Sequence, residues 1–358
     1  MNKINVLSLF DGCSGGQQAL DRLDIKINNY YASEIDKYAI QVTMANYPNT
    51  IQLGSVINVD ITKLEKIDLL CGGSPCQSFS FAGKRKGMST KDSIEILTLE
   101  HYLDLKSQNF EFEGQSYLFW EYMRILTDIR KVNPDVKFLL ENVMMGDKWQ
   151  KILTQAIGIN PIEINSSLVS AQNRKRLYWT NIESEQQGLF GDLKCIIPQP
   201  KDKGILLKDI LQKEINDKYY LSDKMIKCLN KRKGTTYDTF YAADINTKSR
   251  CISSRIAKMG TGDNYIVYNM MPRSGDPSKG GTGLLSRNDG KTYCLDTGNT
   301  NAIEIGSVVR RLTPLECERL QCIKDNYTDY VSDSQRYKMI GNGWTIDVIS
   351  HIFKFINK

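Results

Sequence analysis

Residues 5–16 read NVLSLFDGCSGG, an apolar run that ends directly in a glycine-rich turn. The run is typical of a buried strand, and residues 17–23 behind the turn have the pattern of a helix. Glycines let the backbone approach a ligand closely, and the following helix N-terminus offers free N–H groups. Taken alone, the segment fits a plain strand-to-helix turn as well as a nucleotide-binding one. It is not the Gly-x-Gly-x-x-Gly fingerprint, because Phe10 occupies the first position.

Strand and helix patterns alternate through the first half of the chain. Strands are expected at 30–33, 67–71 and 136–140, and helices at 37–46, 117–132 and 147–157. The alternation predicts an α/β fold with a mostly parallel, doubly wound sheet that carries helices on both faces. Residues 345–355 are again amphipathic, and we expect this helix to pack back on the first domain.

Length and composition predict two domains. At about 100–200 residues per domain, 358 residues suit two units. From about residue 182 the chain is rich in Gly, Ser, Thr, Asn and Lys. We therefore expect a first domain at 1–181, a smaller loop-rich domain at 182–324, and a segment at 325–358 that returns to the first domain. The chain shows neither a run of about 20 apolar residues nor a signal-peptide pattern, so a cytoplasmic location is expected.

The charged residues and cysteines restrict the function classes. Lys and Arg number 47 against 41 Asp and Glu, a net charge of +6 that permits a polyanionic partner. Nine scattered cysteines, with no Cys-x-x-Cys pair, argue against a disulfide framework. The two histidines, His101 and His351, are not clustered, so we expect no metal site. A general acid or base is then expected to be a carboxylate.

Glu34 follows the second expected strand, where an acidic side chain can accept hydrogen bonds from ribose hydroxyls. The plainer interpretation is a surface Glu at a helix start, stabilised by the helix dipole. The turn has no phosphate-binding Lys, which disfavours ATP and GTP. An adenosine ligand without phosphates fits better.

Residues 72–77, GGSPCQ, follow the expected strand 67–71. Two glycines and a proline impose a defined turn at the carboxyl end of the strand, where ligands gather in open α/β sheets. Cys76 is therefore a candidate nucleophile, which needs nearby positive charge or helix N–H groups to form a thiolate. Cys71, inside the strand, is interpreted as a buried apolar residue.

Residues 141–143, ENV, stand at the end of the expected strand 136–140. A buried carboxyl group at such a strand end is suited to acid catalysis. The plainer interpretation is that these residues lead into the N-terminal cap of the helix expected at 147–157. Each motif is modest by itself, but the order of glycine-rich turn, Pro-Cys and Glu-Asn-Val is far more specific.

In this order the motifs resemble the cytosine-5 DNA methyltransferase family of bacterial and phage type. The resemblance runs from Val6 to Ile346, except across the variable middle. Its elements are FDGCSGG at 10–16, PCQ at 75–77, ENV at 141–143, QNRKR at 172–176, RLTPLECERLQ at 311–321 and GNG at 341–343. The family implies a Rossmann-like, S-adenosylmethionine-dependent methyltransferase fold, with 1–181 as the catalytic and cofactor-binding domain and 182–324 as the target recognition domain.

By this resemblance the catalytic residues are Cys76, Glu141, Arg174 and Arg176. Cys76 attacks position 6 of a flipped-out cytosine, which makes position 5 enamine-like. Glu141 contacts the N3 side of the ring, while both arginines hold the base's O2 and the nearby backbone and favour the thiolate. S-adenosylmethionine supplies the methyl group, and loss of the position-5 proton expels the cysteine. Residues 78–88 correspond to a closing loop whose basic cluster at 84–86 is expected to meet DNA phosphates.

The cofactor contacts implied by position are Phe10, Asp11, Gly12, Gly15, Glu34, Ile35, Ser55, Leu118 and Asn342. Ser55 stands where the family often has an Asp beside the adenine, and Asp60 is the alternative alignment. Residues 89–116 are longer than in compact members and are expected to add a helix. Trp344 stands in a Gly-Trp pair where many members have Ser-Val, a change that we expect to be tolerated.

Residues 182–309 are expected to contact bases in the major groove. Candidate contacts are Arg250, Arg255, Lys258, Arg273 and Arg287. The expected partner is double-stranded DNA, bound by a monomer, in a restriction–modification, orphan or phage-protective role. Whether a cognate restriction endonuclease acts separately beside it is left open by the sequence.

Three alternatives remain. One branch of the family methylates transfer RNA, although the long second domain favours DNA. A nucleic-acid-binding regulator without catalysis is opposed by the intact Cys76, Glu141, Arg174 and Arg176. A nicotinamide-dependent oxidoreductase is opposed by the Phe10-first turn and by the Pro-Cys element.

Overall fold

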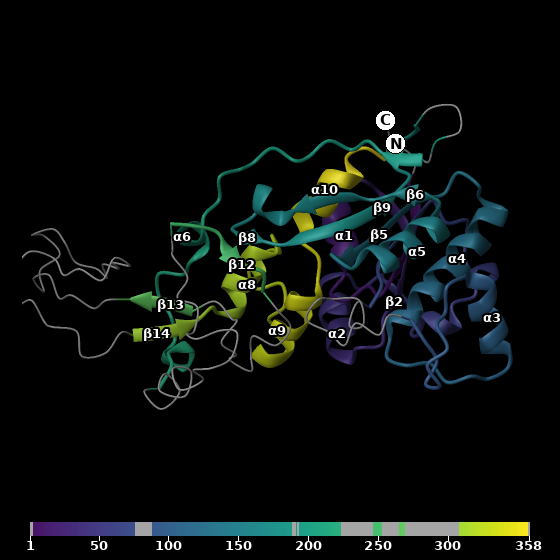
Figure 1. The fold of residues 1–358 in the computed structure, drawn as a ribbon. Helices are drawn as coiled ribbons and strands as arrows, with labels where there is room; N and C mark the ends of the chain where they lie inside the picture. The colour runs from purple at the N-terminus through teal and green to yellow at the C-terminus, as the bar shows by residue number, and fades with distance from the viewer. Residues whose placement is uncertain are drawn as a thin grey trace, which may run out of the picture.

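The computed structural model describes residues 3–75, 88–187, 191, 193–222, 246–252, 265–268 and 308–356. Its main element is a seven-stranded sheet of order β3-β2-β1-β4-β5-β9-β7 (Figure 1). The strands are β1 (Ile4–Leu9), β2 (Ile27–Ser33), β3 (Ile51–Gln52), β4 (Leu69–Gly73), β5 (Lys137–Val143), β7 (Ile162–Asn165) and β9 (Lys175–Thr180). β1 to β5 run parallel, whereas β9 is antiparallel to both of its neighbours. The predicted mostly parallel sheet is confirmed.

Helices cover both faces of this sheet. The helices of the described residues are α1 (Gly15–Asp21), α2 (Lys37–Asn46), α3 (Leu99–Ser107), α4 (Phe119–Val132), α5 (Asp147–Ile157), α6 (Leu207–Ile210), α8 (Pro314–Leu320), α9 (Asp333–Asn342) and α10 (Ile346–Phe353), of which α6 and α8 lie beside β8 and β12 and away from the main sheet (Figure 1). Short 3₁₀ turns are η1 (Val56–Asn58), η2 (Ile61–Lys63), η3 (Ser116–Leu118), η4 (Ser166–Leu168) and η5 (Asp217–Tyr219). The helix predicted at 37–46 has the predicted bounds, and α3 is the helix expected from the long 89–116 stretch.

Alternation along the central strands creates two buried cores. Val6 of β1 and Leu69 of β4 pack with α1 and α10, while Leu7 and Leu70, their neighbours in sequence, pack with α4 and α5. Successive side chains of a strand point to opposite faces, so buried strands of this kind are apolar on both sides. Figure 1 shows the resulting three layers, with α4 and α5 on one side of the sheet and α1 with α10 on the other.

The strand order reverses direction between β1 and β4. From β1 the chain first builds outward through β2 and β3, and then returns to place β4 and β5 on the other side of β1. In open α/β sheets, ligands bind at the carboxyl ends of the strands beside such a reversal. The glycine-rich turn follows β1 and the Pro-Cys turn follows β4, so both predicted motifs lie at this point.

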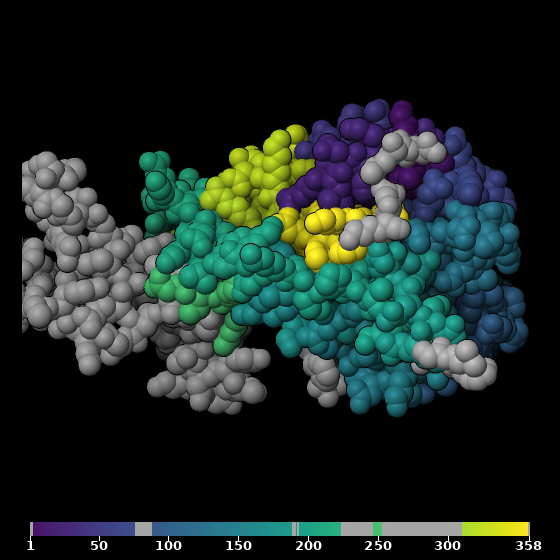
Figure 2. All heavy atoms as spheres, turned by 90° about the horizontal axis from the view of Figure 1, so that it is seen from above, coloured from purple at the N-terminus to yellow at the C-terminus, as the bar shows by residue number. Residues whose placement is uncertain are grey.

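The C-terminal helix packs on the helix that follows the glycine-rich turn. α10 lies against α1, where the hydroxyl of Ser350 donates to the carbonyl of Ala19 at 3.3 Å. Figure 2 shows the C-terminal residues in direct contact with the N-terminal part of the chain. Upstream, Tyr327 donates to the carbonyl of Cys13 in the glycine-rich turn at 2.9 Å. The C-terminal part of the chain therefore packs on, and is hydrogen-bonded to, the glycine-rich turn and helix that follow β1.

The remaining strands form small sheets outside the main one. They are β6 (Ile159–Asn160), β8 (Gln172–Asn173), β10 (Ser184–Gln186), β11 (Leu193–Cys195), β12 (Ser249–Arg250), β13 (Tyr265–Tyr268) and β14 (Val308–Arg311). β13 pairs antiparallel with β14. Behind β14, the fully buried Arg310 forms an ion pair with the fully buried Glu316 at 2.8 Å, which fixes the ribbon to α8. No helix in the described part of the chain has the length and apolar character of a membrane span.

Candidate active site

Three strand ends meet at the reversal of the sheet. β1 ends in the glycine-rich turn, β4 ends at Gly73, and β5 carries Glu141 near its end. Gly73 and Glu141 are register partners across the β4–β5 pair. A Cβ atom at Gly73 would lie 2.9 Å from Oε2 of Glu141, so the carboxylate stands directly over this glycine. Cys76 follows three residues later and lies outside the described residues.

The glycine-rich turn has an unusual backbone. Phe10, Gly12 and Ser14 all have φ near +60°, the left-handed region. For Phe10 and Ser14, which carry a Cβ atom, this conformation is costly, and such outliers concentrate at functional sites. A Cβ atom at Gly12 would meet no atom within 4 Å. The turn therefore has open space on its outer side, as a ligand-binding turn requires.

Glu34 faces this turn from the end of β2. Its Oε2 accepts from the N–H of Gly12 at 2.8 Å, and its Oε1 accepts from the N–H groups of Ile35 and Asp36 at 2.7 and 2.8 Å. Three backbone donors fix the carboxylate, and Oε2 retains acceptor capacity. Ile35 beside it is 70% exposed, an apolar surface next to a fixed carboxylate. Phe10 and Leu118 are half-buried against the α4 side of the core, and Asn342 is exposed at the end of α9.

Ser55 and Asp60 have different environments. Ser55 follows β3, and the hydroxyl of Ser33 at the end of β2 donates to the carbonyl of Gly54 at 2.8 Å. Asp60 instead caps η2 by accepting from the N–H of Thr62 at 3.1 Å. The Ser33 hydrogen bond ties Gly54, the residue before Ser55, to the strand end that precedes Glu34.

Asp11 is buried beneath the turn with an incomplete set of partners. Oδ1 accepts from the hydroxyl of Tyr30 at 2.7 Å, whereas Oδ2 is buried with no hydrogen-bond partner. A Cβ atom at Gly16 would lie 2.5 Å from that hydroxyl, so glycine is needed there for Tyr30 to reach Asp11. Burial raises the pKa of Asp11 to about 6.

Stability should depend on pH through Asp11. The pKa of this carboxyl is about 6 when folded, against 3.8 as the ordinary value. Burial thus favours the protonated form, and the stabilisation relative to an ionised carboxyl is lost as pH rises from about 3.8 to 6. Relative to Asp11→Asn, the unfolding free energy of the ligand-free wild type should fall by about 3 kcal/mol across this window. Denaturant unfolding of both proteins between about pH 3.5 and 6.5 measures the difference, and a difference that stays constant or grows with pH would contradict the assignment.

Glu141 is held by two donors from distant parts of the chain. Arg176 on β9 places Nε 3.0 Å from Oε1, and the indole N–H of Trp344 donates to Oε2 at 3.2 Å. Glu141 is 9% exposed, so both contacts form in a largely dry site. Behind it, Nδ2 of Asn142 donates to the hydroxyl of Ser74 at 3.0 Å, which ties the end of β5 to the Pro-Cys turn.

Arg174 has a different environment from Arg176. Its guanidinium donates to the carbonyls of Gly341 and Gly343 at 3.4 and 2.9 Å, and to the carbonyl of Ile252 at 3.4 Å. Nη1 also lies 3.2 Å from Sγ of Cys251. In this conformation Arg174 joins β9, the GNG element and the 246–252 segment, while Arg176 is the arginine that contacts Glu141.

Several predicted site residues lie outside the described residues. These are Cys76, the closing-loop residues 78–87, and the candidate base contacts Arg255, Lys258, Arg273 and Arg287. Arg250 is described and exposed at the end of β12. Sequence reasoning missed Tyr30 and the role of Trp344, because neither belongs to a chemical motif. The only signal was that Trp344 departs from the usual Ser-Val.

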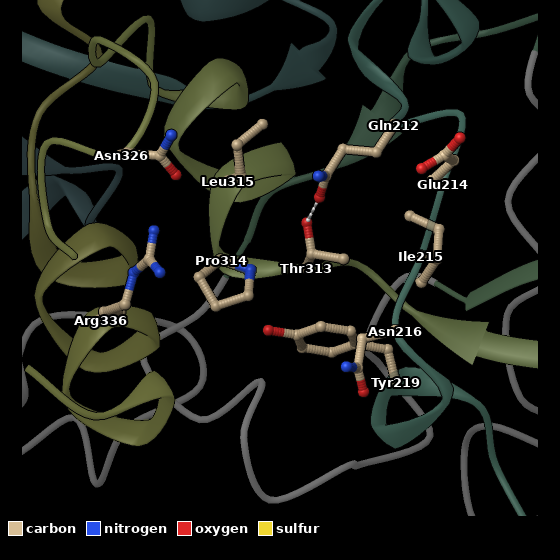
Figure 3. A pocket seen from close by; sticks show the side chains of 10 residues that line it. All are labelled: Gln212, Glu214, Ile215, Asn216, Tyr219, Thr313, Pro314, Leu315, Asn326 and Arg336. Atoms are coloured by element: carbon tan, nitrogen blue, oxygen red, sulfur yellow. Dashed lines mark hydrogen bonds between the residues drawn. The ribbon is translucent and has the colours of Figure 1, made fainter.

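A separate pocket lies away from the strand ends (Figure 3). It is lined by η5 and the residues before it, by the start of α8, and by Asn326 and Arg336, and several of its polar side chains have partners within the protein. Thr313 is bonded to Gln212, Tyr219 donates to Asp333 at 2.9 Å, and Arg336 binds Asp329 at 2.8 Å. Within the described residues, no three His, Cys, Asp or Glu side chains gather as a metal site.

Solved structures with the same fold are methyltransferases. The Entamoeba histolytica methyltransferase EhMeth superposes with a TM-score of 0.63 at 16% identity, covering 99% of this chain and 98% of that chain. A mutant of Spodoptera frugiperda DNMT2 superposes with a TM-score of 0.62 at 18% identity, covering 99% and 100%. At these identities the likeness shows that the chain shares the fold of these two proteins.

Sequence comparison gives the family. The family model of the C-5 cytosine-specific DNA methylases matches residues 4–102 and 164–358, most of the chain. The orphan methyltransferase M.SPRI of Bacillus phage SPR is 26% identical, covering 100% of this chain and 99% of the relative. The type II methyltransferase M1.ScrFI of Lactococcus lactis subsp. cremoris is 27% identical, covering 98% and 77%. The chain belongs to the C-5 cytosine-specific DNA methylases and is a DNA (cytosine-5-)-methyltransferase.

Proposed function

We propose that this enzyme transfers a methyl group from S-adenosylmethionine to position 5 of a flipped-out cytosine in a specific double-stranded DNA sequence, through a covalent adduct to Cys76. The observation that carries the proposal is the position of Glu141. Its carboxylate stands over Gly73, three residues before Cys76, and is fixed by Arg176 and Trp344. An acid and a nucleophile at adjacent strand ends are what addition to a cytosine ring requires.

The chemistry divides between Cys76 and Glu141. The Cys76 thiolate forms a bond to position 6, and the electron pair displaced from the 5–6 double bond makes position 5 nucleophilic. Glu141 in its protonated form donates its proton to N3 of the ring, which neutralises the negative charge that develops there, and it takes the proton back when Cys76 is expelled. After methylation, loss of the position-5 proton re-forms the double bond and expels Cys76. The cytosine leaves the duplex to reach this site, at a cost of a few kcal/mol.

The residues around the glycine-rich turn fit S-adenosylmethionine, which when bound supplies the methyl group. Gly12 leaves open space, Glu34 presents a fixed carboxylate suited to ribose hydroxyls, and Ile35 offers an exposed apolar face suited to adenine. Asp11 has one buried oxygen without a partner, an acceptor suited to an ammonium group. We assign cofactor contacts to these residues and to Phe10, Gly15, Ser55, Leu118 and Asn342.

The two arginines are assigned related roles. Arg176 holds Glu141 and presents its charge at the catalytic strand ends. Arg174 holds the GNG element through its carbonyls. Together they supply the positive charge that favours a Cys76 thiolate and holds O2 of the base.

The parts of the chain are assigned separate roles in catalysis and in DNA recognition. Residues 1–181 form the catalytic and cofactor-binding domain, 182–324 select the target sequence, and 325–358 complete the catalytic domain. A monomer acts on double-stranded DNA in the cytoplasm of a bacterial or phage-infected cell. Both orphan and type II methyltransferases occur among its relatives, so the role is protective with or without a separate restriction endonuclease.

Transfer of a labelled methyl group tests the proposal. The wild-type protein, with labelled S-adenosylmethionine, should label unmethylated double-stranded DNA and leave transfer RNA unlabelled. Digestion to nucleosides should place the label in 5-methylcytosine, and sequencing should place it in one short sequence. Label found only in transfer RNA would show that RNA, and not DNA, is the substrate. No methyl transfer to either nucleic acid would favour a binding protein without catalysis.

A further inference from the structure

Trp344 lies between the glycine-rich turn and the strand ends that carry Gly73 and Glu141. It follows α9 at the point where the GNG element returns to the carboxyl ends of the strands. Its indole N–H donates to Oε2 of Glu141 at 3.2 Å. The ring itself lies over two glycines, Gly15 in the glycine-rich turn and Gly73 at the end of β4.

The two glycines provide the space that the indole fills. A Cβ atom at Gly15 would lie 3.4 Å from Cε3 of Trp344, and one at Gly73 would lie 3.0 Å from its Nε1. The first is an ordinary packing distance, while the second is closer than real Cβ contacts allow without adjustment. The indole is therefore packed directly on the backbone of the nucleotide-binding turn and on the backbone that leads to Cys76.

The backbone on both sides of Trp344 is fixed. The carbonyl of Gly343 accepts from Nη2 of Arg174 at 2.9 Å and from Nε2 of Gln321 at 3.2 Å. Thr345 donates its hydroxyl to Oε1 of Gln321 at 2.7 Å. Because the residues before and after it are held by buried partners, the indole N–H has a defined direction, which a positioning role requires.

The carboxylate of Glu141 has two opposed anchors. Arg176 binds Oε1 and Trp344 binds Oε2, so rotation about the last side-chain bond would break both contacts. A charge-assisted hydrogen bond to a carboxylate is stronger than one between neutral groups. Arg176 supplies the positive charge at Oε1. Trp344 fixes the direction of Oε2, because this oxygen must lie in line with the indole N–H to accept its hydrogen bond.

We propose that Trp344 is a positioning residue for Glu141 and links the cofactor turn to the carboxylate that contacts the cytosine. The inference rests on the proposed function and deepens it. The indole N–H orients Glu141. The indole ring packs against both Gly15 and Gly73 and so connects the two turns. A side chain without an indole would supply neither the N–H donor to Glu141 nor the ring between Gly15 and Gly73.

Trp344→Phe separates the two parts of this role, because it keeps the ring packing and removes the N–H donor. Single-turnover methyl transfer to DNA should slow about tenfold to 100-fold, since the bond lost is to a carboxylate in a dry site. The dissociation constants for S-adenosylmethionine and DNA should stay within about twofold, because the packing on Gly15 remains. Trp179→Phe is the matched control: it also removes a buried indole hydrogen bond, 3.0 Å to Thr154, but outside the site, and should keep the wild-type rate.

A double-mutant cycle shows whether Trp344 acts through Glu141. In a Glu141→Gln background, Trp344→Phe should add less than about a twofold loss, because the group that it positions is already gone. Equal fold losses in both backgrounds, or full activity of Trp344→Phe, would overturn the inference. Gly73→Ala gives an independent route if Trp344→Phe fails to fold, since its Cβ atom would crowd both Glu141 Oε2 and Trp344 Nε1. It should also slow transfer without weakening cofactor binding. Absence of transfer by the wild type would instead reject the proposed function itself.

Discussion

Replacing Cys76 by serine is expected to lower the rate of methyl transfer to DNA by at least about 10⁴-fold, as loss of a catalytic nucleophile does in other enzymes. A thiol with an ordinary pKa of about 8.5 is partly ionised near neutral pH, whereas a serine hydroxyl is not. Serine has nearly the same size, so the binding of S-adenosylmethionine and DNA should be retained. Labelled methyl transfer under single-turnover conditions measures the loss.

The cysteines that the structure describes show why Cys76 is the expected nucleophile. Cys71 is fully buried in β4, and burial raises the pKa of its thiol to about 12, so it stays protonated. Cys251 is the competitor. Its Sγ lies 3.2 Å from Nη1 of Arg174 and 4.0 Å from Nη2 of Arg176, and these charges outweigh burial and lower the pKa of its thiol. Cys251 does not, however, follow a strand end of the main sheet.

Cys251→Ser is therefore the matched control for Cys76→Ser. It should keep the rate within about threefold, because a serine hydroxyl can also accept from Arg174. DNA with 5-fluorocytosine at the target site adds a direct assignment. Fluorine at position 5 cannot leave as a proton does, so the thiolate is not expelled and the protein stays bonded to the DNA. Mass spectrometry of the adduct should find the base on Cys76, and a base on Cys251 would show that the nucleophile is misassigned.

Local patterns allowed the central sheet to be predicted. The runs that became β1, β4 and β5 are largely apolar on both faces, and helical patterns were recognised at 17–23, 37–46, 117–132 and 147–157, so the alternation of strands and helices was identified. The sequence placed the glycine-rich turn and the Pro-Cys turn at the ends of two strands, and the structure shows that these strands, β1 and β4, are neighbours. This is the part of the site that sequence alone could give.

Long-range contacts were not predictable in the same way. β9 was interpreted only as the QNRKR motif, because its antiparallel pairing with β5 depends on a partner far away in sequence. That pairing puts Arg176 beside Glu141 and turns Arg174 toward the C-terminal element. Trp344 likewise reaches Glu141 across 203 positions of sequence. Such contacts depend on tertiary packing, which neither periodicity nor local propensity encodes.

Glu141→Gln is expected to lower the rate of methyl transfer about 10²-fold to 10⁴-fold, the usual contribution of a positioned acid or base. The amide is close in size to the carboxylate, so the sheet should remain intact. It carries neither the negative charge nor a transferable proton. The dissociation constant for S-adenosylmethionine should change little, because the hydrogen bonds that fix Glu34 to Gly12, Ile35 and Asp36 do not involve Glu141.

The contacts of Glu141 explain why glutamine is a poor substitute despite its shape. Both carboxylate oxygens accept, one from Arg176 and one from Trp344. An amide has one acceptor and two donors, so its NH₂ group must face either the guanidinium or the indole N–H. The oxygen should turn to Arg176, the charged donor, and leave Trp344 without an acceptor. Thermal melting should then show a modest loss of stability beside the large loss of rate, and a Glu141→Gln enzyme with wild-type kcat would exclude this carboxylate from the chemistry.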